Sequence, residues 1–288
     1  MIFIRKIKLT LIRLWKGINL IPVFYEIYLE SFYERRRNNS KNPFLKSFKR
    51  YSLFSQADED SIVDELIKRL EIKNGKFIEL GVGNGSQNNT LNLLSQNWKG
   101  IWIGNEDLIF KPGKKLKYIK TWITKENINK IINSNLDFFA SPKDFKDLSI
   151  DLLSIDLDGN DYYIWENILI NKLKPKIIIA EYNANLGPRA IWKMPYHSLN
   201  NWKSRRDNYF GASFLSLVNL FNKFGYIPIC CNSDTGVNLF AVKNEYKSCF
   251  EEISNIHYDD IFEYPHYALS IFGRTHKFSK LILKDISD

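Results

Sequence analysis

Four acidic side chains near the middle of the chain are the first candidates for chemistry. Asp156, Asp158 and Asp161 follow one apolar run, and Glu181 ends the next. If both runs are parallel strands, their carboxyl ends meet at one edge of a sheet, and the carboxylates lie together. Crowded carboxylates raise one another's pKa, which suits a general base, or they bind a hard cation such as Mg²⁺. The alternative is a polar turn that starts a helix near Tyr162.

A glycine-rich stretch, residues 75–86 with the sequence GKFIELGVGNGS, is a second candidate site. Its apolar part is typical of a buried strand. Gly81, Gly83 and Gly85 allow the backbone to turn sharply and to approach a ligand closely. Glu79 lies within the apolar part, where an ionised carboxylate is costly unless something pairs with it. A ligand ammonium group is one such partner, and a tight turn without a ligand is the alternative.

A third set of polar residues follows the next apolar run, residues 100–103. The run ends in Gly104, and Glu106 and Asp107 come directly after Asn105. In Rossmann-like folds an acidic residue at this place binds the ribose hydroxyl pair of a nucleotide. We therefore expect a ribose contact from Glu106, with Asp107 as the second choice.

The glycine spacing separates two kinds of nucleotide site. A dinucleotide fingerprint, G-x-G-x-x-G, would need a glycine where Ser86 stands. The spacing is instead E-x-G-x-G-x-G, which resembles motif I of the class I S-adenosylmethionine (SAM) methyltransferases. The resemblance implies that Glu79 lies near the methionine ammonium group of SAM. It also implies that Gly81, Gly83 and Gly85 pass beneath the amino-acid part of the cofactor.

A set of stretches in a fixed order resembles the FkbM-type methyltransferases. They are SQADED (55–60), FIELGVGNGS (77–86), LLSIDLDGNDYYIW (152–165), IIIAEYNANLGP (177–188), MPYH (194–197), YFGASFLSL (209–217) and GVNLFAV (236–242). The resemblance covers roughly residues 51–270. It implies a SAM-dependent methyltransferase that modifies a hydroxyl group of a sugar or glycan intermediate. One departure is Gly104, because the family usually has an acidic residue directly after the hydrophobic triplet of the second strand.

The resemblance also implies roles for the acidic side chains. Asp158 and Glu181 are candidates for the base that takes the proton of the acceptor hydroxyl, and Asp156 has either a structural role or a contact with the cofactor. Related sugar O-methyltransferases with an Asp-rich end of the fourth strand use a divalent metal, so Mg²⁺ on Asp156 and Asp158, with Glu181 as a further ligand, is a hypothesis. His197 is a rival base because it lies in a long loop. The same loop has four aromatic residues that form either a platform for a sugar ring or a small core of the loop itself: Trp192, Tyr196, Trp202 and Tyr209.

The elements that must position these residues alternate between apolar strands and helical segments. Strands are predicted at 77–80, 100–103, 118–123, 151–156 and 177–182, helices at 62–70, 90–94, 127–132 and 214–224, and two final strands at 226–231 and 238–242. Such alternation implies right-handed crossovers and a mostly parallel, doubly wound sheet. The final two strands predict an antiparallel hairpin. The fold class is therefore α/β and Rossmann-like, with the C-terminal hairpin of the class I methyltransferases.

The charge distribution divides the chain into an arm, residues 1–50, and a domain, residues 51–288, with a C-terminal extension from about residue 245. The arm holds 12 Lys+Arg and 3 Asp+Glu, which accounts for the whole net charge of +9. The neutral domain argues against a nucleic-acid-binding protein. Three cysteines without metal-ligand spacing predict a reducing, cytoplasmic location.

The arm itself predicts an amphipathic helix over residues 2–21, with apolar residues at helical spacing and basic residues on the other faces. Its charges interrupt any run long enough to span a bilayer or to act as a signal peptide. Such a helix either lies on an anionic membrane surface through residues 1–40 or docks on protein. The sequence does not determine the oligomeric state.

Two other functions compete with methyl transfer. An NAD-linked oxidoreductase is disfavoured by Ser86 and by the predicted terminal hairpin. A degenerate, non-catalytic Rossmann-like binding module stays an alternative because Gly104 stands where an acidic residue is expected. Binding of S-adenosylhomocysteine (SAH), of NAD or of neither would separate the three.

Overall fold

The computed structural model describes residues 27–140, 148–200, 207–266 and 276–287. The chain divides into two compact units, Met1–Asn39 and Ser40–Asp288. In the first unit, residues 27–39 are helical, and the helix predicted at residues 2–21 lies outside the described residues. Among the described residues, no helix combines the length and the apolar character needed to cross a membrane.

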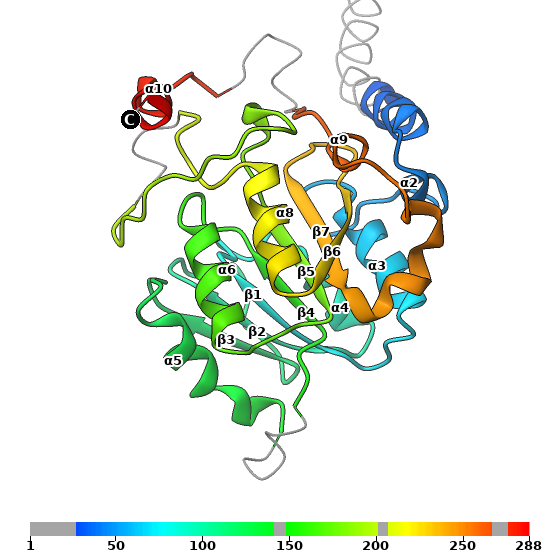
Figure 1. The fold of residues 1–288 in the computed structure, drawn as a ribbon. Coiled ribbons are helices and arrows are strands. Elements are labelled where there is room, and N and C mark those ends of the chain that lie inside the picture. Colours follow the sequence, from blue (N-terminus) through cyan, green and yellow to red (C-terminus); the bar gives the residue numbers. More distant parts are fainter. Residues whose placement is uncertain (1–26, 141–147, 201–206, 267–275, 288) are drawn as a thin grey trace, which may run out of the picture. The chain divides into compact units, whose positions relative to one another are not determined.

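The second unit is built on one sheet of seven strands. Their bounds are β1 Lys76–Leu80, β2 Lys99–Gly104, β3 Leu116–Lys120, β4 Leu152–Ile155, β5 Ile177–Glu181, β6 Tyr226–Cys231 and β7 Asn238–Lys243. The spatial order is β3-β2-β1-β4-β5-β7-β6. The first five strands pair in parallel, whereas β7 is antiparallel to both β5 and β6. This is the class I methyltransferase sheet, which confirms the predicted fold class (Figure 1).

Helices cover both faces of the sheet. In the described part of the second unit, the α-helices are α2 Pro43–Lys46, α3 Glu59–Arg69, α4 Leu91–Ser95, α5 Ile128–Asn133, α6 Asp161–Ile170, α8 Phe214–Lys223, α9 Tyr258–Ile261 and α10 Lys280–Ser287, and the 3₁₀ helices are η1 Leu136–Phe138, η3 Ala184–Leu186 and η4 Asn244–Ile253. One core joins α5, α6 and α8 to the sheet, and a second joins α2, α3 and α4 to it. Figure 1 shows α6 and α8 next to each other over the sheet, where the rings of Trp165 and Phe221 are in contact; α3 belongs to the core on the other face.

Alternation along β1 shows how the apolar runs produce this layered arrangement. Ile78 and Leu80 belong to the core with α5, α6 and α8, and Phe77 belongs to the opposite core. Side chains on a strand alternate between the two faces of a sheet, so a strand covered on both faces is apolar throughout. Glu79 is the exception, and it is buried too, with 4% of its surface exposed.

The position of β3 differs from the sequence prediction. The predicted strand ran from 118 to 123, but β3 ends at Lys120. Its neighbour β2 ends at Gly104, which pairs with Lys120, so the backbone beyond this point has no strand to pair with. The following residues, including the buried Ile123, form a loop at the edge of the sheet.

Candidate functional site

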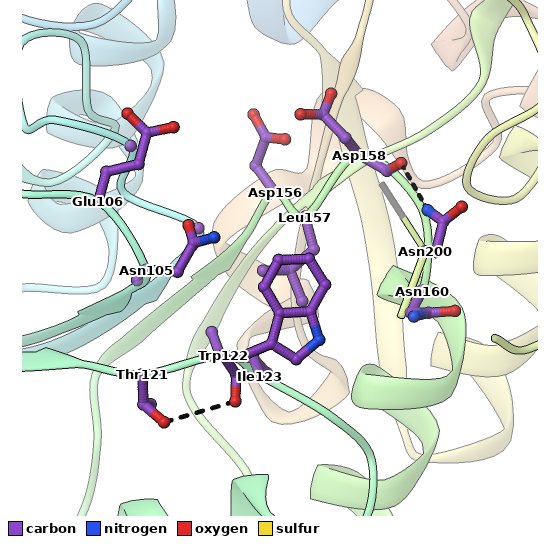
Figure 2. A pocket seen from close by; sticks show the side chains of 13 residues that line it. Asn105, Glu106, Thr121, Trp122, Ile123, Asp156, Leu157, Asp158, Asn160 and Asn200 are labelled. Atoms are coloured by element: carbon purple, nitrogen blue, oxygen red, sulfur yellow. Dashed lines mark hydrogen bonds between the residues drawn. The ribbon is translucent and has the colours of Figure 1, made fainter. Parts of the chain in front are cut away.

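A pocket opens at the carboxyl ends of four neighbouring parallel strands. Its walls come from the residues that follow β1 (Gly81, Gly83), end or follow β2 (Gly104, Asn105, Glu106), follow β3 (Thr121, Trp122, Ile123) and follow β4 (Asp156, Leu157, Asp158), with Asn160 and Asn200 beside them. Figure 2 shows the side chains of Glu106, Asp156 and Asp158 around this pocket, with the indole ring of Trp122 below them. The carboxyl edge of an open α/β sheet is where such folds bind ligands.

Two of the motif glycines form the part of the pocket wall next to β1. Gly81 has φ +85°, and a Cβ there would lie 1.6 Å from the carbonyl oxygen of Asp156, so only glycine allows the loops after β1 and β4 to touch. Gly83 has φ +51°, and no atom lies within 4 Å of a Cβ built on it. The backbone at Gly83 is therefore open to close approach by a ligand. Gly85 does not line the pocket and packs against Leu108 and Phe110.

Glu79 lies behind the pocket wall, among the residues of the glycine loop. Its Oε1 accepts a hydrogen bond from the backbone N–H of Asn89 (2.9 Å), and its Oε2 accepts one from the Thr90 hydroxyl (2.5 Å). The Thr90 oxygen in turn accepts one from Trp102 Nε1 (2.9 Å). Burial raises the pKa of Glu79 to about 7. Glu79 thus holds the loop that follows the glycines. It is not among the residues that line the pocket, whereas the resemblance implied a contact with the methionine ammonium group of SAM.

The two acidic candidates after β2 are separated by the structure. Glu106 lines the pocket. The Asp107 side chain is 88% exposed and forms an ion pair with Lys120, 2.6 Å away, so it does not line the pocket. A Cβ at Gly104 would lie 3.0 Å from Val82 Cγ2, which leaves little room for an acidic side chain at that position. Glu106 is therefore the acidic residue that can reach a ligand from this strand.

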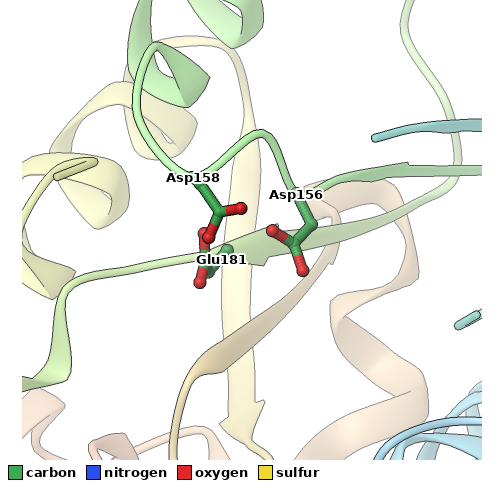
Figure 3. A group of neighbouring side chains, drawn as sticks. All are labelled: Asp156, Asp158 and Glu181. Carbon is green, nitrogen blue, oxygen red and sulfur yellow. The ribbon is translucent and has the colours of Figure 1, made fainter. Parts of the chain in front are cut away.

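Three carboxyl groups meet between the ends of β4 and β5. Asp156, Asp158 and Glu181 each have one oxygen within 4.8 Å of the others (Figure 3). Burial, and next the charge of Asp158, raise the pKa of Asp156 to about 8. Burial and the charge of Asp156 raise the pKa of Glu181 well above its usual value. Neighbouring carboxyl groups disfavour one another's ionised form, and an all-carboxylate set suits a hard divalent ion.

Asp161 has a different role from its neighbours. Its Oδ1 accepts a hydrogen bond from Leu157 N (2.8 Å), and its Oδ2 accepts one from Gly159 N (2.9 Å). It therefore shapes the turn that leads into α6, as the polar-turn alternative predicted. Asp158 has φ +52° in this turn. Asp161 thus holds the turn in which Asp158 stands, and Asp156 directly precedes this turn.

A short segment, residues 196–200, contacts the loops that follow β3 and β4 at the pocket. The side-chain amide of Asn160 donates to His197 O (2.8 Å) and accepts from His197 N (3.2 Å). Trp122 Nε1 donates to Ser198 O (2.7 Å), and Asn200 Nδ2 donates to Asp158 O (3.3 Å). These bonds hold Trp122 and Asn200 in the pocket wall.

The side chain predicted as a rival base, His197, is exposed and does not line the pocket. Only its backbone is connected to the pocket, through the two hydrogen bonds with the side chain of Asn160. Of the loop aromatics, Trp192 is buried and packs on Tyr209, with ring centroids 5.5 Å apart, in a small core that also holds Met194 and Ile282. These two form a core of the loop, and Trp202 lies outside the described residues.

Several pocket residues have no signal in the sequence. Trp122 fell inside a predicted strand, and Asn105, Asn160 and Asn200 are single polar residues in loops. Their placement depends on contacts between segments far apart in the chain, such as the bond between Trp122 and Ser198.

Comparisons with known proteins add a distant likeness of fold. No protein-family model and no curated protein matches the chain. A candidate hemolysin from Lactococcus lactis aligns with a TM-score of 0.38 at 11% identity, over 71% of this chain and 100% of that one. MycE methyltransferase from the mycinamycin biosynthetic pathway, in complex with Mg, SAH and mycinamycin VI, aligns with a TM-score of 0.40 at 9% identity, over 64% of this chain and 48% of that one.

A third solved structure is 1,6-didemethyltoxoflavin-N1-methyltransferase from Burkholderia thailandensis, with SAH bound. It aligns with a TM-score of 0.36 at 11% identity, over 64% of this chain and 77% of that one. Similarities of this size do not assign residues. The class I methyltransferase fold rests on the order and direction of the strands.

Proposed function

We propose that this protein is a SAM-dependent methyltransferase that modifies a hydroxyl group of a sugar or glycan intermediate. The observation that carries the proposal is the pocket at the ends of β1 to β4, where the open backbone of Gly83 and the carboxyl group of Glu106 face one space. Gly81 and Gly83 would lie beneath the amino-acid part of SAM, Glu106 would bind the ribose hydroxyls, and Asp156 would contact the cofactor between them. The acceptor class comes from the family resemblance.

The acidic side chains of the site would serve the acceptor. SAM supplies an electrophilic methyl group on its sulfonium. Asp158 and Glu181 would orient the acceptor hydroxyl in line with the methyl carbon and take its proton as the new carbon–oxygen bond forms and the carbon–sulfur bond breaks. The products are a methyl ether, SAH and one proton. A raised pKa, as Glu181 has, makes its ionised carboxylate a stronger base toward the acceptor proton.

The alternative functions give different binding results. Two features disfavour an NAD-linked oxidoreductase. The dinucleotide-binding fold has no antiparallel strand like β7 next to β5, and its fingerprint has a glycine where this chain has Ser86. Calorimetry with SAH and with NAD⁺ tests the proposal. SAH should bind and NAD⁺ should not. Binding of NAD⁺ alone would favour the oxidoreductase, and binding of neither would favour a non-catalytic module.

Binding of a divalent metal is the alternative role that we propose for the same carboxyl groups. Asp156 and Asp158, with Glu181, would hold Mg²⁺ through oxygen ligands, and the ion would supply positive charge beside the acceptor oxygen. Mg²⁺ should raise the melting temperature of the wild-type protein and leave that of the Asp158→Asn variant unchanged. Methyl transfer that is unaffected by EDTA would remove the metal from the proposal.

The N-terminal arm is proposed to attach a cytoplasmic protein to an anionic membrane surface. Its net charge of +9 and the helical spacing of its apolar residues support this. Deletion of residues 1–39, the first compact unit, should abolish sedimentation with anionic liposomes and leave SAH binding unchanged. Liposome binding that survives the deletion would contradict the proposal.

A further inference from the structure

Three lysines form one row across the amino ends of β1, β2 and β3. Lys76 and Lys99 are the first residues of β1 and β2, and they pair with each other in the parallel register. Lys115 directly precedes β3, and its carbonyl oxygen accepts a hydrogen bond from Gly100 N (2.9 Å), which places it beside Lys99. Neighbouring strands lie about 4.8 Å apart, so the Cα atoms of this lysine row span roughly 10 Å.

The side chains of the lysine row lie on one face of the sheet and share one pocket. Residues an even number of positions apart on a strand share a face. On each of the three strands, the isoleucine two or four positions after the lysine packs in the core with α5, α6 and α8: Ile78, Ile101 and Ile119. A pocket of about 270 Å³ is lined by the three lysines together with Asn74, Asn97 and Phe139, and Phe139 belongs to the same core.

The charges of the lysine row are not compensated by the protein. In the part of the chain that the structure describes, none of the three lysines forms an ion pair, whereas three neighbouring lysines each pair with an aspartate: Lys117, Lys120 and Lys176. Asp151 lies next to Lys76 across the sheet, but its Oδ1 pairs with Lys176 Nζ (2.7 Å) and its Oδ2 accepts a hydrogen bond from the backbone N of Lys76 (2.8 Å). Like charges on directly neighbouring strands repel, so an anion in the pocket would relieve the repulsion.

We propose that this pocket binds a diphosphate group. Lysine ammonium groups bind phosphate oxygens as point charges, and three of them match the charge of a diphosphate. The side-chain amides of Asn74 and Asn97 are hydrogen-bonded to each other (2.7 Å), so the lysines are the groups that meet the charge of the ligand. The site is independent of the proposed function, because the lysines stand at the amino ends of the strands and the pocket proposed for SAM lies at their carboxyl ends.

Two triple variants with the same net charge test the site. The pocket variant replaces the lysine row with glutamine: Lys76→Gln, Lys99→Gln and Lys115→Gln. The control variant makes the same change at three exposed lysines in α8, η4 and α10, outside the pocket: Lys223→Gln, Lys247→Gln and Lys284→Gln. Both variants keep the basic arm, so any binding of anions by the arm contributes equally to both.

The test is calorimetry with the full-length chain and inorganic pyrophosphate, at low ionic strength and without divalent cations. Wild type and the control variant should bind pyrophosphate with dissociation constants within about threefold. The pocket variant should bind it about tenfold more weakly, because three ion pairs of ordinary surface strength are lost. Equal binding by the two variants, or no binding by the wild type, would overturn the inference.

The melting temperature separates loss of the site from loss of the fold. Without pyrophosphate and at low ionic strength, the pocket variant should melt no lower than the control variant, because its substitutions remove repulsion. A lower melting temperature would show that the lysine row stabilises the fold by itself, and it would contradict the inference.

Neutral liposomes that carry farnesyl diphosphate identify the source of the diphosphate group. Sedimentation of the pocket variant that is weaker than that of the control variant would assign the group to a lipid. Equal sedimentation, together with weaker pyrophosphate binding by the pocket variant, would assign it to a soluble ligand.

Discussion

Glu106 and Asp107 are adjacent in the chain, but only Glu106 lines the pocket, and the surface ion pair of Asp107 with Lys120 holds that side chain outside it. A carboxylate that accepts hydrogen bonds from both ribose hydroxyls is worth about 1.5–3 kcal/mol. Glu106→Gln should therefore weaken SAH binding at least about tenfold. Asp107→Asn should leave it unchanged, and calorimetry on both variants measures this. Equal losses in the two variants would contradict the assignment.

The buried carboxyl groups of Glu79 and Glu59 predict how stability depends on pH. Burial raises the pKa of each from 4.5 to about 7. Between these values the folded state binds more protons than the unfolded state, so the free energy of unfolding falls as pH rises. Each group contributes on the order of 3 kcal/mol to that fall. Below about pH 4.5 their contribution to stability is fully present, and it is lost as pH rises through 7.

Urea unfolding in EDTA at several pH values from 5 to 8.5 measures this effect. Asp156, whose pKa burial raises to about 8, extends the fall to higher pH. If Mg²⁺ binds to Asp156, Asp158 and Glu181, adding it should restore the free energy of unfolding that is lost through Asp156. The loss through Glu79 and Glu59 should remain. A free energy of unfolding that rises from pH 5 to 7 would contradict the account.

At the scale of elements, the start of α3 is tied to the turn between β6 and β7. Asp58, fully buried, accepts hydrogen bonds from Ser233 N (3.0 Å), Ser233 Oγ (2.5 Å) and Asp234 N (3.1 Å). Arg50 forms a buried ion pair with Asp234 at 2.5 Å. The motif Ser-Gln-Ala-Asp-Glu-Asp therefore joins distant segments of the domain and lies outside the pocket wall.

Asp58→Ala should leave these donors buried without a partner and lower the free energy of unfolding by about 3 kcal/mol. SAH affinity, measured where the variant is still folded, should not change. Asp137→Ala, at a side chain that is 63% exposed, is the control and should change stability by less than about 0.5 kcal/mol. A large loss of SAH affinity in Asp58→Ala would mean that the motif also shapes the cofactor site.

The elements that the sequence predicts well are those whose pattern is local. β1, β4 and β5 are apolar runs buried on both faces, and each lies within about one residue of its predicted bounds. The meeting of Asp156 and Asp158 with Glu181 follows from this, because all three stand at the carboxyl ends of adjacent parallel strands. β3 was misplaced because its end is set by the length of its neighbour β2.

The loops could not be predicted in the same way. His197 looked suitable for chemistry, but the side chain of Asn160 holds its backbone and leaves its ring exposed. Trp122 fell inside a predicted strand, and it lines the pocket while its indole N–H donates to Ser198 O. Glu79 is buried as expected, but it bonds to its own loop. Such placements depend on contacts between distant segments.

At the scale of the whole molecule, the sheet brings the proposed cofactor contacts and the carboxyl groups to one edge. The ends of β1 and β2 carry the proposed cofactor contacts, and the ends of β4 and β5 carry the carboxyl groups. Residues 1–39 of the basic arm form a separate compact unit, so the proposed membrane attachment and the proposed catalysis reside in different parts of the chain.

The most direct test of the account is SAH binding by a protein in which the open backbone at Gly83 is filled. Gly83→Asn keeps the positive φ that asparagine tolerates but places a side chain where no atom lies within 4 Å. Gly225→Asn is the matched control, because Gly225 has φ +83°, is equally uncrowded and lies outside the pocket wall. By calorimetry, wild type and Gly225→Asn should bind SAH equally, and Gly83→Asn should bind it at least about tenfold more weakly. SAH binding by Gly83→Asn that equals that of the wild type, or no binding by the wild type, would contradict the central claim.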